Sequence, residues 1–207
     1  MVVKFSKTLC LWTVGTVLAF GAPAVESTQT KPGNEVPMWK EARRPDAKGT
    51  RIKVPKQILE ELVADPNDCM DPADSRKMDA YKIPNGDTFL IAVWGRGTCF
   101  CSPTGNCDFW IYRERDGKFE QLLSTGMTND FGFLERRTNG YRDFIRWSHG
   151  SAFDSGALHF SFNGERYTDD CSWDETYEGH ELPNGGWKWN PKPKITSDSC
   201  RELATIK

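Results

Sequence analysis

The chain has 207 residues, of which 38% are hydrophobic and 27% are charged, and its net charge at pH 7 is −2. This length is sufficient for one domain with a packed core. The slightly acidic balance lacks the excess of Lys and Arg that a phosphate backbone requires, so nucleic acid is not an expected partner.

The N-terminus has the pattern of a secretory signal peptide over residues 1–24. Lys4 and Lys7 precede an apolar run over 9–20, and residues 22–24 supply the small side chains at which signal peptidase cuts. The run is shorter than the about 20 apolar residues that a transmembrane helix needs. We therefore expect a secreted or periplasmic protein with no membrane span after signal removal, and a retained membrane anchor is the alternative.

Residues 25–50 combine Pro, Gly, Thr and charged side chains with few bulky apolar groups. Such a segment cannot offset its ordering entropy by burial, so we expect a flexible linker before a disulfide-stabilised β-domain over 51–207. Pro55 suits a first helical position, and the apolar residues after it fall at helical spacings. The sequence predicts one short helix over 55–64, with its apolar face packed on a sheet.

After Tyr81 the chain alternates short β-forming runs with turn dipeptides. The predicted strands are 88–94, 109–113, 118–123, 131–135, 141–147, 158–162 and 165–168. The turn dipeptides between them are Asn85-Gly86, Asp116-Gly117, Asn139-Gly140 and Asn163-Gly164. Because Asn, Asp and Gly tolerate positive φ, these pairs are typical of hairpins, and an antiparallel meander is the expected outcome.

Residues 85–170 have the pattern of two diverged copies of one unit. When Asn85-Gly86 is placed on Asn139-Gly140, TFLIAVWGRGTCF aligns with RDFIRWSHGSAF. The first copy is the longer, and its excess falls at 102–107. We predict a mainly β fold, an antiparallel meander of two diverged repeats forming a sandwich or partly open barrel, with one short N-terminal helix. Chance similarity between turn-rich segments is the alternative.

The segments NGDTFLIAV and TNGYRDFIRW, with the later DGKF and NGERY, resemble the FG-GAP and VCBS-like β-repeats of exported bacterial proteins. In that family an Asp-rich turn often binds calcium through several oxygens. The turns at 83–87 and 138–143 hold too few carboxylates at the required alternation, so the resemblance does not extend to calcium. Two copies also cannot close a propeller.

The cysteines outside the predicted signal peptide form an even set, typical of disulfides in an exported protein. They are Cys69, Cys99, Cys101, Cys107, Cys171 and Cys200. Many connectivities are possible. Because two cysteines two apart on a strand are poorly placed to join each other, we favour the pairs Cys101–Cys107, Cys69–Cys99 and Cys171–Cys200.

The cysteine spacing of 99–107 fits neither a structural zinc site nor a thioredoxin-like redox site. Structural zinc takes four ligands with pairs spaced by two to four residues, and the redox motif is Cys-x-x-Cys. The stretch CFCSPTGNC is therefore predicted to staple a lengthened hairpin tip. We expect neither a metal nor a cofactor.

Several residue types of catalytic sites occur close together in the sequence. Ser148, His149 and Asp154 have the types of a Ser-His-Asp triad, but triad groups must converge from positions set by the fold, so a polar hairpin tip is favoured. The carboxylates of 169–181 are predicted to form a solvated acidic loop. His159 is expected on the solvent face of its strand. No catalytic residue is assigned, and a non-enzymatic protein is favoured.

A group of aromatic and acidic residues near the C-terminus forms the candidate ligand-binding set. Its members are Trp187, Trp189, Trp173, Tyr177 and Glu178. The Trp187 pair lies between an Asn-Gly-Gly turn and a proline run that leave little core nearby. Exposed aromatic residues stack on sugars or anchor protein partners. An edge strand held by the Cys200 staple is the alternative.

The leading hypothesis for function is an exported non-catalytic binding module for a protein or a cell-envelope glycan. One alternative is a cell-envelope hydrolase that uses His149, Asp154 or the carboxylates of 169–181. Another is an inhibitor of a host hydrolase such as lysozyme, because an acidic stretch attracts a basic enzyme.

Overall fold

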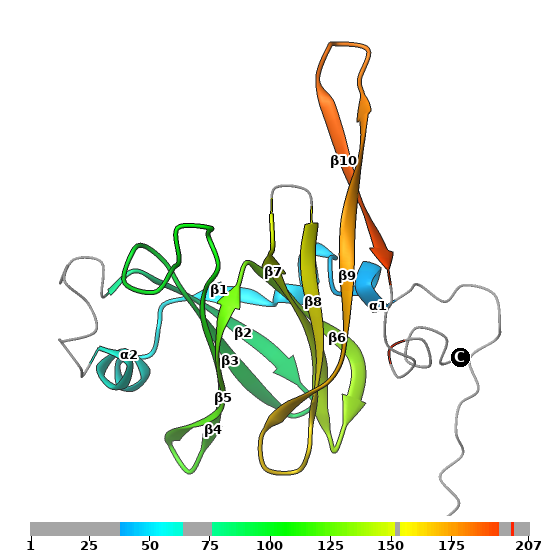
Figure 1. Ribbon diagram of the computed structural model, residues 1–207. Coiled ribbons are helices and arrows are strands. Elements are labelled where there is room, and N and C mark those ends of the chain that lie inside the picture. The colour runs from blue at the N-terminus through cyan, green and yellow to red at the C-terminus, as the bar shows by residue number, and fades with distance from the viewer. Residues whose placement is uncertain (1–37, 64–75, 152–153, 195–199, 201–207) are drawn as a thin grey trace, which may run out of the picture. The chain divides into compact units, whose positions relative to one another are not determined.

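The computed structural model describes residues 38–63, 76–151, 154–194 and 200 (Figure 1). The predicted signal peptide, the first part of the predicted linker and Cys69 lie outside the described residues. The chain divides into two compact units, Met1–Gly33 and Asn34–Lys207, and every described residue belongs to the second unit. None of the described helices is long and apolar enough to cross a bilayer.

The described part of the chain forms short helical segments and ten strands. The helical segments are α1 (Met38–Glu41), the 3-10 helix η1 (Pro45–Lys48) and α2 (Lys56–Leu62). The strands are β1 (Thr50–Ile52), β2 (Met78–Asn85), β3 (Thr88–Gly95), β4 (Cys107–Arg115), β5 (Lys118–Thr128), β6 (Asp130–Thr138), β7 (Tyr141–His149), β8 (Asp154–Phe162), β9 (Tyr167–Glu181) and β10 (Trp187–Lys194).

The strands make two five-stranded antiparallel sheets. Sheet A has the order β1-β2-β3-β4-β5, and sheet B has the order β10-β9-β8-β7-β6. Within each sheet, strands that are consecutive in the chain lie side by side, as Figure 1 shows. The predicted mainly β meander is confirmed.

The two aligned sequence copies build corresponding hairpins in the two sheets. Asn85-Gly86 joins β2 to β3, and Asn139-Gly140 joins β6 to β7. Asp116-Gly117 likewise joins β4 to β5, and Asn163-Gly164 lies between β8 and β9. Asn139 has a φ of 50° and Gly140 a φ of 82°, the left-handed conformation that these turn residues tolerate. The first copy thus lies in sheet A and the second in sheet B, and β1 and β10 are the outermost strands at one edge of each sheet.

The inner faces of the sheets share an aromatic core. Phe109 from sheet A lies 4.7 Å from the ring of Phe131 in sheet B, and Phe144 stacks on Phe160 at 4.7 Å. The Phe144 side chain is fully buried. Since burying one such side chain stabilises the fold by about 1.5–3 kcal/mol, this cluster holds the sheets together.

The outer face of sheet A, away from the shared core, is covered by α2. Ile58 of α2 is fully buried in a cluster with Ala80, Val93 and Tyr112. The predicted helix over 55–64 is confirmed in the slightly shorter range of α2, with Pro55 preceding its first turn.

The prediction of a flexible linker through residue 50 is wrong for residues 38–50. These residues form α1, η1 and the start of β1, and Ala42 is 1% exposed. Gly132 of β6 makes this packing possible, because an added Cβ there would lie 1.7 Å from the carbonyl oxygen of Ala42. This segment is ordered although it has few apolar side chains, because the backbone of Ala42 packs against Gly132 and Arg43 forms an ion pair with Glu175.

The acidic stretch 169–181 is also corrected. It is not a solvated loop but most of the 15-residue strand β9. Its alternate residues Cys171, Trp173 and Glu175 are buried on the outer face of sheet B, while Ser172 and Asp174 between them are exposed. The alternation of burial, with period two, is the pattern of a half-buried strand.

Candidate functional site

The β9–β10 hairpin extends beyond the rest of sheet B. The last described pair between β8 and β9 is Asp154↔Thr176, whereas β9 continues to Glu181 and pairs there with β10. Figure 1 shows this two-stranded ribbon continuing past the end of β8. We call residues 177–191 the hairpin arm.

Backbone register divides the arm into two faces. Trp187 pairs with Glu181, Trp189 with Gly179, and Pro191 with Tyr177. Because strand residues alternate between faces, these six positions share one face, here called the aromatic face. The prediction brought Trp187, Trp189 and Tyr177 together, and the register places all three on it.

The opposite face of the arm is polar and its groups pair with one another. Lys192 Nζ lies 2.5 Å from Glu178 Oε1, and Asn190 Nδ2 lies 2.5 Å from His180 Nε2. Glu178 therefore belongs to the face opposite Tyr177. Lys192 thus pairs with one carboxylate of the acidic stretch, and Lys194 lies opposite Asp174 in the ladder.

Trp173 is not available to a ligand. Its side chain is 2% exposed in a cluster with Trp147, Ala157 and Cys200. The indole Nε1 donates to Glu175 Oε1 at 3.1 Å. The proposed ligand role of Trp173 came from its acidic neighbours, of which Asp174 lies on the other face of the strand and Glu175 is buried beside Trp173. Trp173 is a core residue.

Glu175 is a buried carboxylate that the sequence analysis did not single out. It is 0% exposed and accepts hydrogen bonds from the indoles of Trp147, at 2.9 Å, and Trp173. Arg43 forms an ion pair with it and stacks over the Trp147 ring at 4.5 Å. The period-two alternation from Cys171 would have placed Glu175 on this buried face. Its partners are all engaged, so we assign it a structural role.

The cysteine loop forms the predicted staple. Cys101 and Cys107 are joined by a disulfide, as are Cys171 and Cys200. Cys99 is also disulfide-bonded, and its predicted partner Cys69 lies outside the described residues. Two of the three favoured pairs are thus confirmed.

The loop also contacts the corresponding tip of the second repeat. Asn106, 2% exposed, accepts from the backbone N–H of His149 at 2.7 Å and donates to its carbonyl oxygen at 3.0 Å. Sequence comparison located the insertion but could not show that it reaches across to the other sheet. The inserted residues therefore connect the two repeats.

A small cleft lies where these tips meet. It has a volume of about 310 Å³ and is lined by Thr104, His149, Gly150 and Ser151. The Nδ1 atom of His149 is buried and has no hydrogen-bond partner among the described residues. Ser148 instead donates to the carbonyl oxygen of Gly156. Among the described residues, no hydrogen bond joins the side chains of Ser148, His149 and Asp154, so the triad types are not assembled.

His159 is buried rather than exposed, contrary to expectation. Its Nδ1 lies 2.5 Å from Asp170 Oδ1, and its Nε2 lies 3.6 Å from Asp143 Oδ2. Burial alone would lower the pKa of His159, but hydrogen bonds and charge interactions with the two carboxylates outweigh burial and raise it. A β-bulge at His159/Phe160 shifts the strand register here. His159, Asp170 and Cys171 lie close enough to hold a metal, but the sulfur of Cys171 is in a disulfide.

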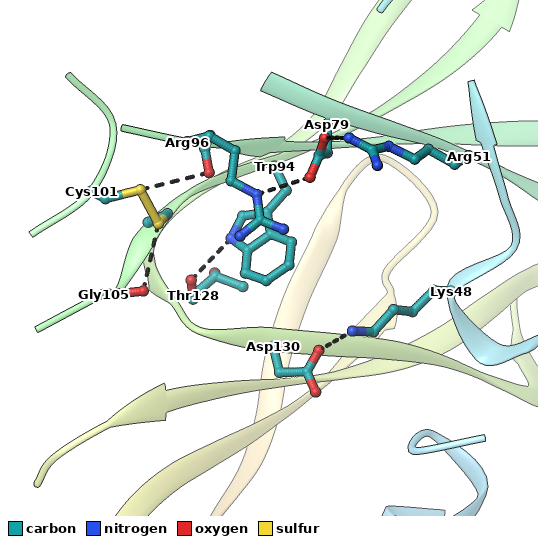
Figure 2. Close-up of polar contacts among 11 residues, drawn as sticks. Lys48, Arg51, Asp79, Trp94, Arg96, Cys101, Gly105, Thr128 and Asp130 are labelled. Atoms are coloured by element: carbon teal, nitrogen blue, oxygen red, sulfur yellow. Dashed lines mark hydrogen bonds and ion pairs between the residues drawn. A yellow bond between two sulfur atoms is a disulfide. The ribbon is translucent and has the colours of Figure 1, made fainter. Parts of the chain in front are cut away.

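A second cluster with charged groups lies near one end of sheet A (Figure 2). Asp79 pairs with both Arg51 and Arg96, and the Arg96 guanidinium lies 4.0 Å over the ring of Trp94. The Trp94 indole donates to the carbonyl oxygen of Thr128 at 3.1 Å. Because Arg51, Asp79 and Trp94 lie on separate strands, no local pattern in the sequence predicts this cluster.

In comparisons with known proteins, no family model, curated protein or solved structure matches this chain. The resemblance to FG-GAP and VCBS-like repeats stays a prediction.

Proposed function

We propose that this chain is an exported binding module that holds a cell-envelope glycan on the aromatic face of the hairpin arm. One observation carries the proposal: β9 and β10 continue past Thr176, where no third strand pairs with them among the described residues. A two-stranded ribbon is only marginally stable in water. A ligand bound along the aromatic face would add contacts to both strands of this ribbon.

The arm favours a neutral ligand over an anionic one. Gly179 is the partner of Trp189 across the ladder, so β9 contributes no side chain at that position. Glu178 and Lys192 pair with each other on the opposite face, and the charged residue of the aromatic face is the carboxylate Glu181, opposite Trp187. Aromatic residues beside an open glycine suit a sugar ring, which stacks through its apolar face. A protein ligand is the other outcome of the test below.

Export is part of the proposal. The signal-peptide pattern of residues 1–24 supports it, and disulfides such as Cys101–Cys107 and Cys171–Cys200 persist in oxidising compartments. If the chain is exported as proposed, mass spectrometry of the secreted or periplasmic protein will find an N-terminus at Val25. Absence of the chain from the secreted and periplasmic fractions would contradict export, and retention of residues 1–24 in the membrane fraction would favour a membrane anchor.

The binding proposal predicts that Trp187→Ala and Trp189→Ala each reduce co-sedimentation of the oxidised chain with insoluble peptidoglycan. We expect at least a fivefold loss of affinity, since truncating one stacked aromatic anchor costs about 1–2 kcal/mol. Lys188→Ala is the matched control, because Lys188 lies between the two tryptophans on the opposite face. Its affinity should equal that of the wild type.

Melting temperature separates binding from folding in this experiment. The Trp variants should melt within a few degrees of the wild type. Equal binding by the wild type and both Trp variants would refute a role for the aromatic face in glycan binding. Capture of a defined envelope protein by the wild type, lost in the Trp variants, would assign the same face to a protein ligand.

A further inference from the structure

A groove opens in sheet A where β1 separates from β2. The last pair between the two strands is Ile52↔Ala80, after which the chain turns away through Lys53, Val54 and Pro55 into α2. Met78 and Asp79 of β2 lie beyond that last pair. The groove between them has a volume of about 570 Å³, within the range of pockets that hold small molecules.

One part of the groove lining is apolar. Ile52, Val54 and Met78 are half-buried and pack against the cluster beneath α2, and Leu59 of α2 adds to the same wall. These side chains still border the open volume. An apolar part of a ligand would therefore find a preformed surface here.

The other part of the lining is cationic. Arg51, Lys53 and Arg76 are exposed at the groove, and Asp79 is the carboxylate among its described lining residues. Asp79 is already engaged by Arg51 and by Arg96, which is itself held over Trp94 (Figure 2). The groove thus has an excess of positive charge in a chain whose net charge is negative.

Fold stability gives no reason for this arrangement. The Arg51 side chain is 70% exposed, and exposed ion pairs contribute little to stability. Asp79 instead fixes the direction of two guanidinium groups, and guanidinium is suited to bind carboxylate or phosphate through two hydrogen bonds. Like charges gathered at one concave site attract an anion from solution.

We propose that this groove binds an oxyanion, phosphate or carboxylate, carried on an apolar body. The anionic group contacts Arg51, Lys53 and Arg76, and the apolar body lies against Ile52, Val54 and Met78. The site belongs to β1, β2 and α2, and it does not depend on the hairpin arm.

The test is calorimetric titration of the oxidised chain with octyl phosphate, below the concentration at which the probe forms micelles. The double variant Lys53→Glu/Arg76→Glu should lose at least tenfold in affinity. Arg115→Glu is the matched control. Arg115 is 70% exposed, as Arg51 is. It lies at the end of β4 away from Phe109, which pairs with Trp94, the partner of Asp79. Its affinity should be unchanged.

Equal loss in the control and in the double variant would overturn the proposal, because it would indicate unspecific attraction. Absence of binding by the wild type would overturn it as well. If the double variant unfolds at a lower temperature, Lys53→Gln/Arg76→Gln replaces it, with loss of binding again expected.

Further arms of the titration identify the source of the anion. Inorganic phosphate should bind at least tenfold more weakly than octyl phosphate, and equal affinity would refute the role of the apolar wall. Titration with octanoate in place of octyl phosphate compares the affinity of the groove for a carboxylate with its affinity for a phosphate. Binding to vesicles with phosphatidic acid, but not to phosphatidylcholine vesicles, would support a lipid headgroup; binding of octyl phosphate alone would support a free amphiphile.

Discussion

At the scale of single residues, the outer face of sheet B depends on buried charged groups with several partners each. Asp143 is fully buried and pairs with Arg136 at 3.1 Å, while Thr138 donates to it at 3.0 Å. His159 lies between Asp143 and Asp170. Buried charges are tolerated only where such partners compensate the loss of hydration.

The pair of His159 and Asp170 predicts a pH dependence of stability. The pKa of His159 is raised in the fold, so its contribution is complete below about pH 6.5 and is lost as pH rises through the folded-state pKa. Burial would raise the pKa of Asp170, but His159 lowers it, so that contribution is lost as pH falls below about 4. We expect the free energy of unfolding to decrease above pH 6.5.

Urea unfolding at pH 6 and pH 8.5 measures this decrease. In His159→Gln the part of the decrease that belongs to His159 should disappear. His180→Gln is the control, because His180 is an exposed histidine on the arm. An unchanged difference between the two pH values in His159→Gln would show that His159 does not hold its proton more tightly in the fold.

Glu175 gives a prediction on stability. Glu175→Ala removes the acceptor of two indoles and the partner of Arg43. Breaking a buried pair in this way costs about 3–5 kcal/mol, measured by urea unfolding. Glu175→Gln keeps an acceptor oxygen and should cost less. A loss below about 1 kcal/mol for the alanine variant would contradict the structural role assigned to Glu175.

At the scale of elements, the two repeats are joined through their tips as well as through the shared core. Asn106 links the cysteine loop before β4 to His149 at the end of β7. Asn106→Ala removes the partner of two part-buried backbone groups of His149, which costs about 1–3 kcal/mol. Asn106→Asp retains the acceptor oxygen, so its free energy of unfolding should lie between those of the alanine variant and the wild type. Unchanged stability of the alanine variant would contradict the link.

Local patterns in the sequence predicted most elements of the fold. Turn dipeptides such as Asn139-Gly140 and the apolar spacing from Ile58 act over a few residues, so the hairpins and α2 were found. The sequence offered β10 only as an alternative, an edge strand held by the Cys200 staple, because its prolines weaken the strand pattern, and β10 is indeed an edge strand of sheet B. The ordered segment 38–50 was missed, because α1 is held by contact with β6. Such contacts are made between residues far apart in the chain.

The candidate sites show the same division. The sequence singled out Trp187 and Trp189 because an Asn-Gly-Gly turn and a proline run flank them, and their role as ligand-binding residues stays a prediction. The groove of Arg51, Lys53 and Arg76 and the triplet of Asp143, His159 and Asp170 were not, since their members come from separate strands. His159 was misplaced on the solvent face because an alternating strand does not reveal that its other face is also buried.

At the scale of the whole molecule, two sheets built from related copies differ in what each adds at its edge. Sheet A gains β1 and the groove beside it, and sheet B gains β10 and the arm. The disulfides Cys101–Cys107 and Cys171–Cys200 lie one in each half. The repeats thus serve as a common scaffold, and the two proposed ligand surfaces lie on the additions.

The central claim is that the aromatic face of the arm holds a glycan. It is tested most directly by NMR spectra of the backbone amides of the oxidised, isotopically labelled chain. The chain is titrated with soluble peptidoglycan fragments. We predict that the amide shifts that change belong to residues 177–191, and that Trp189→Ala abolishes the change. Chemical shift changes confined to other strands would contradict the claim. So would the absence of any change in a chain that co-sediments with insoluble peptidoglycan.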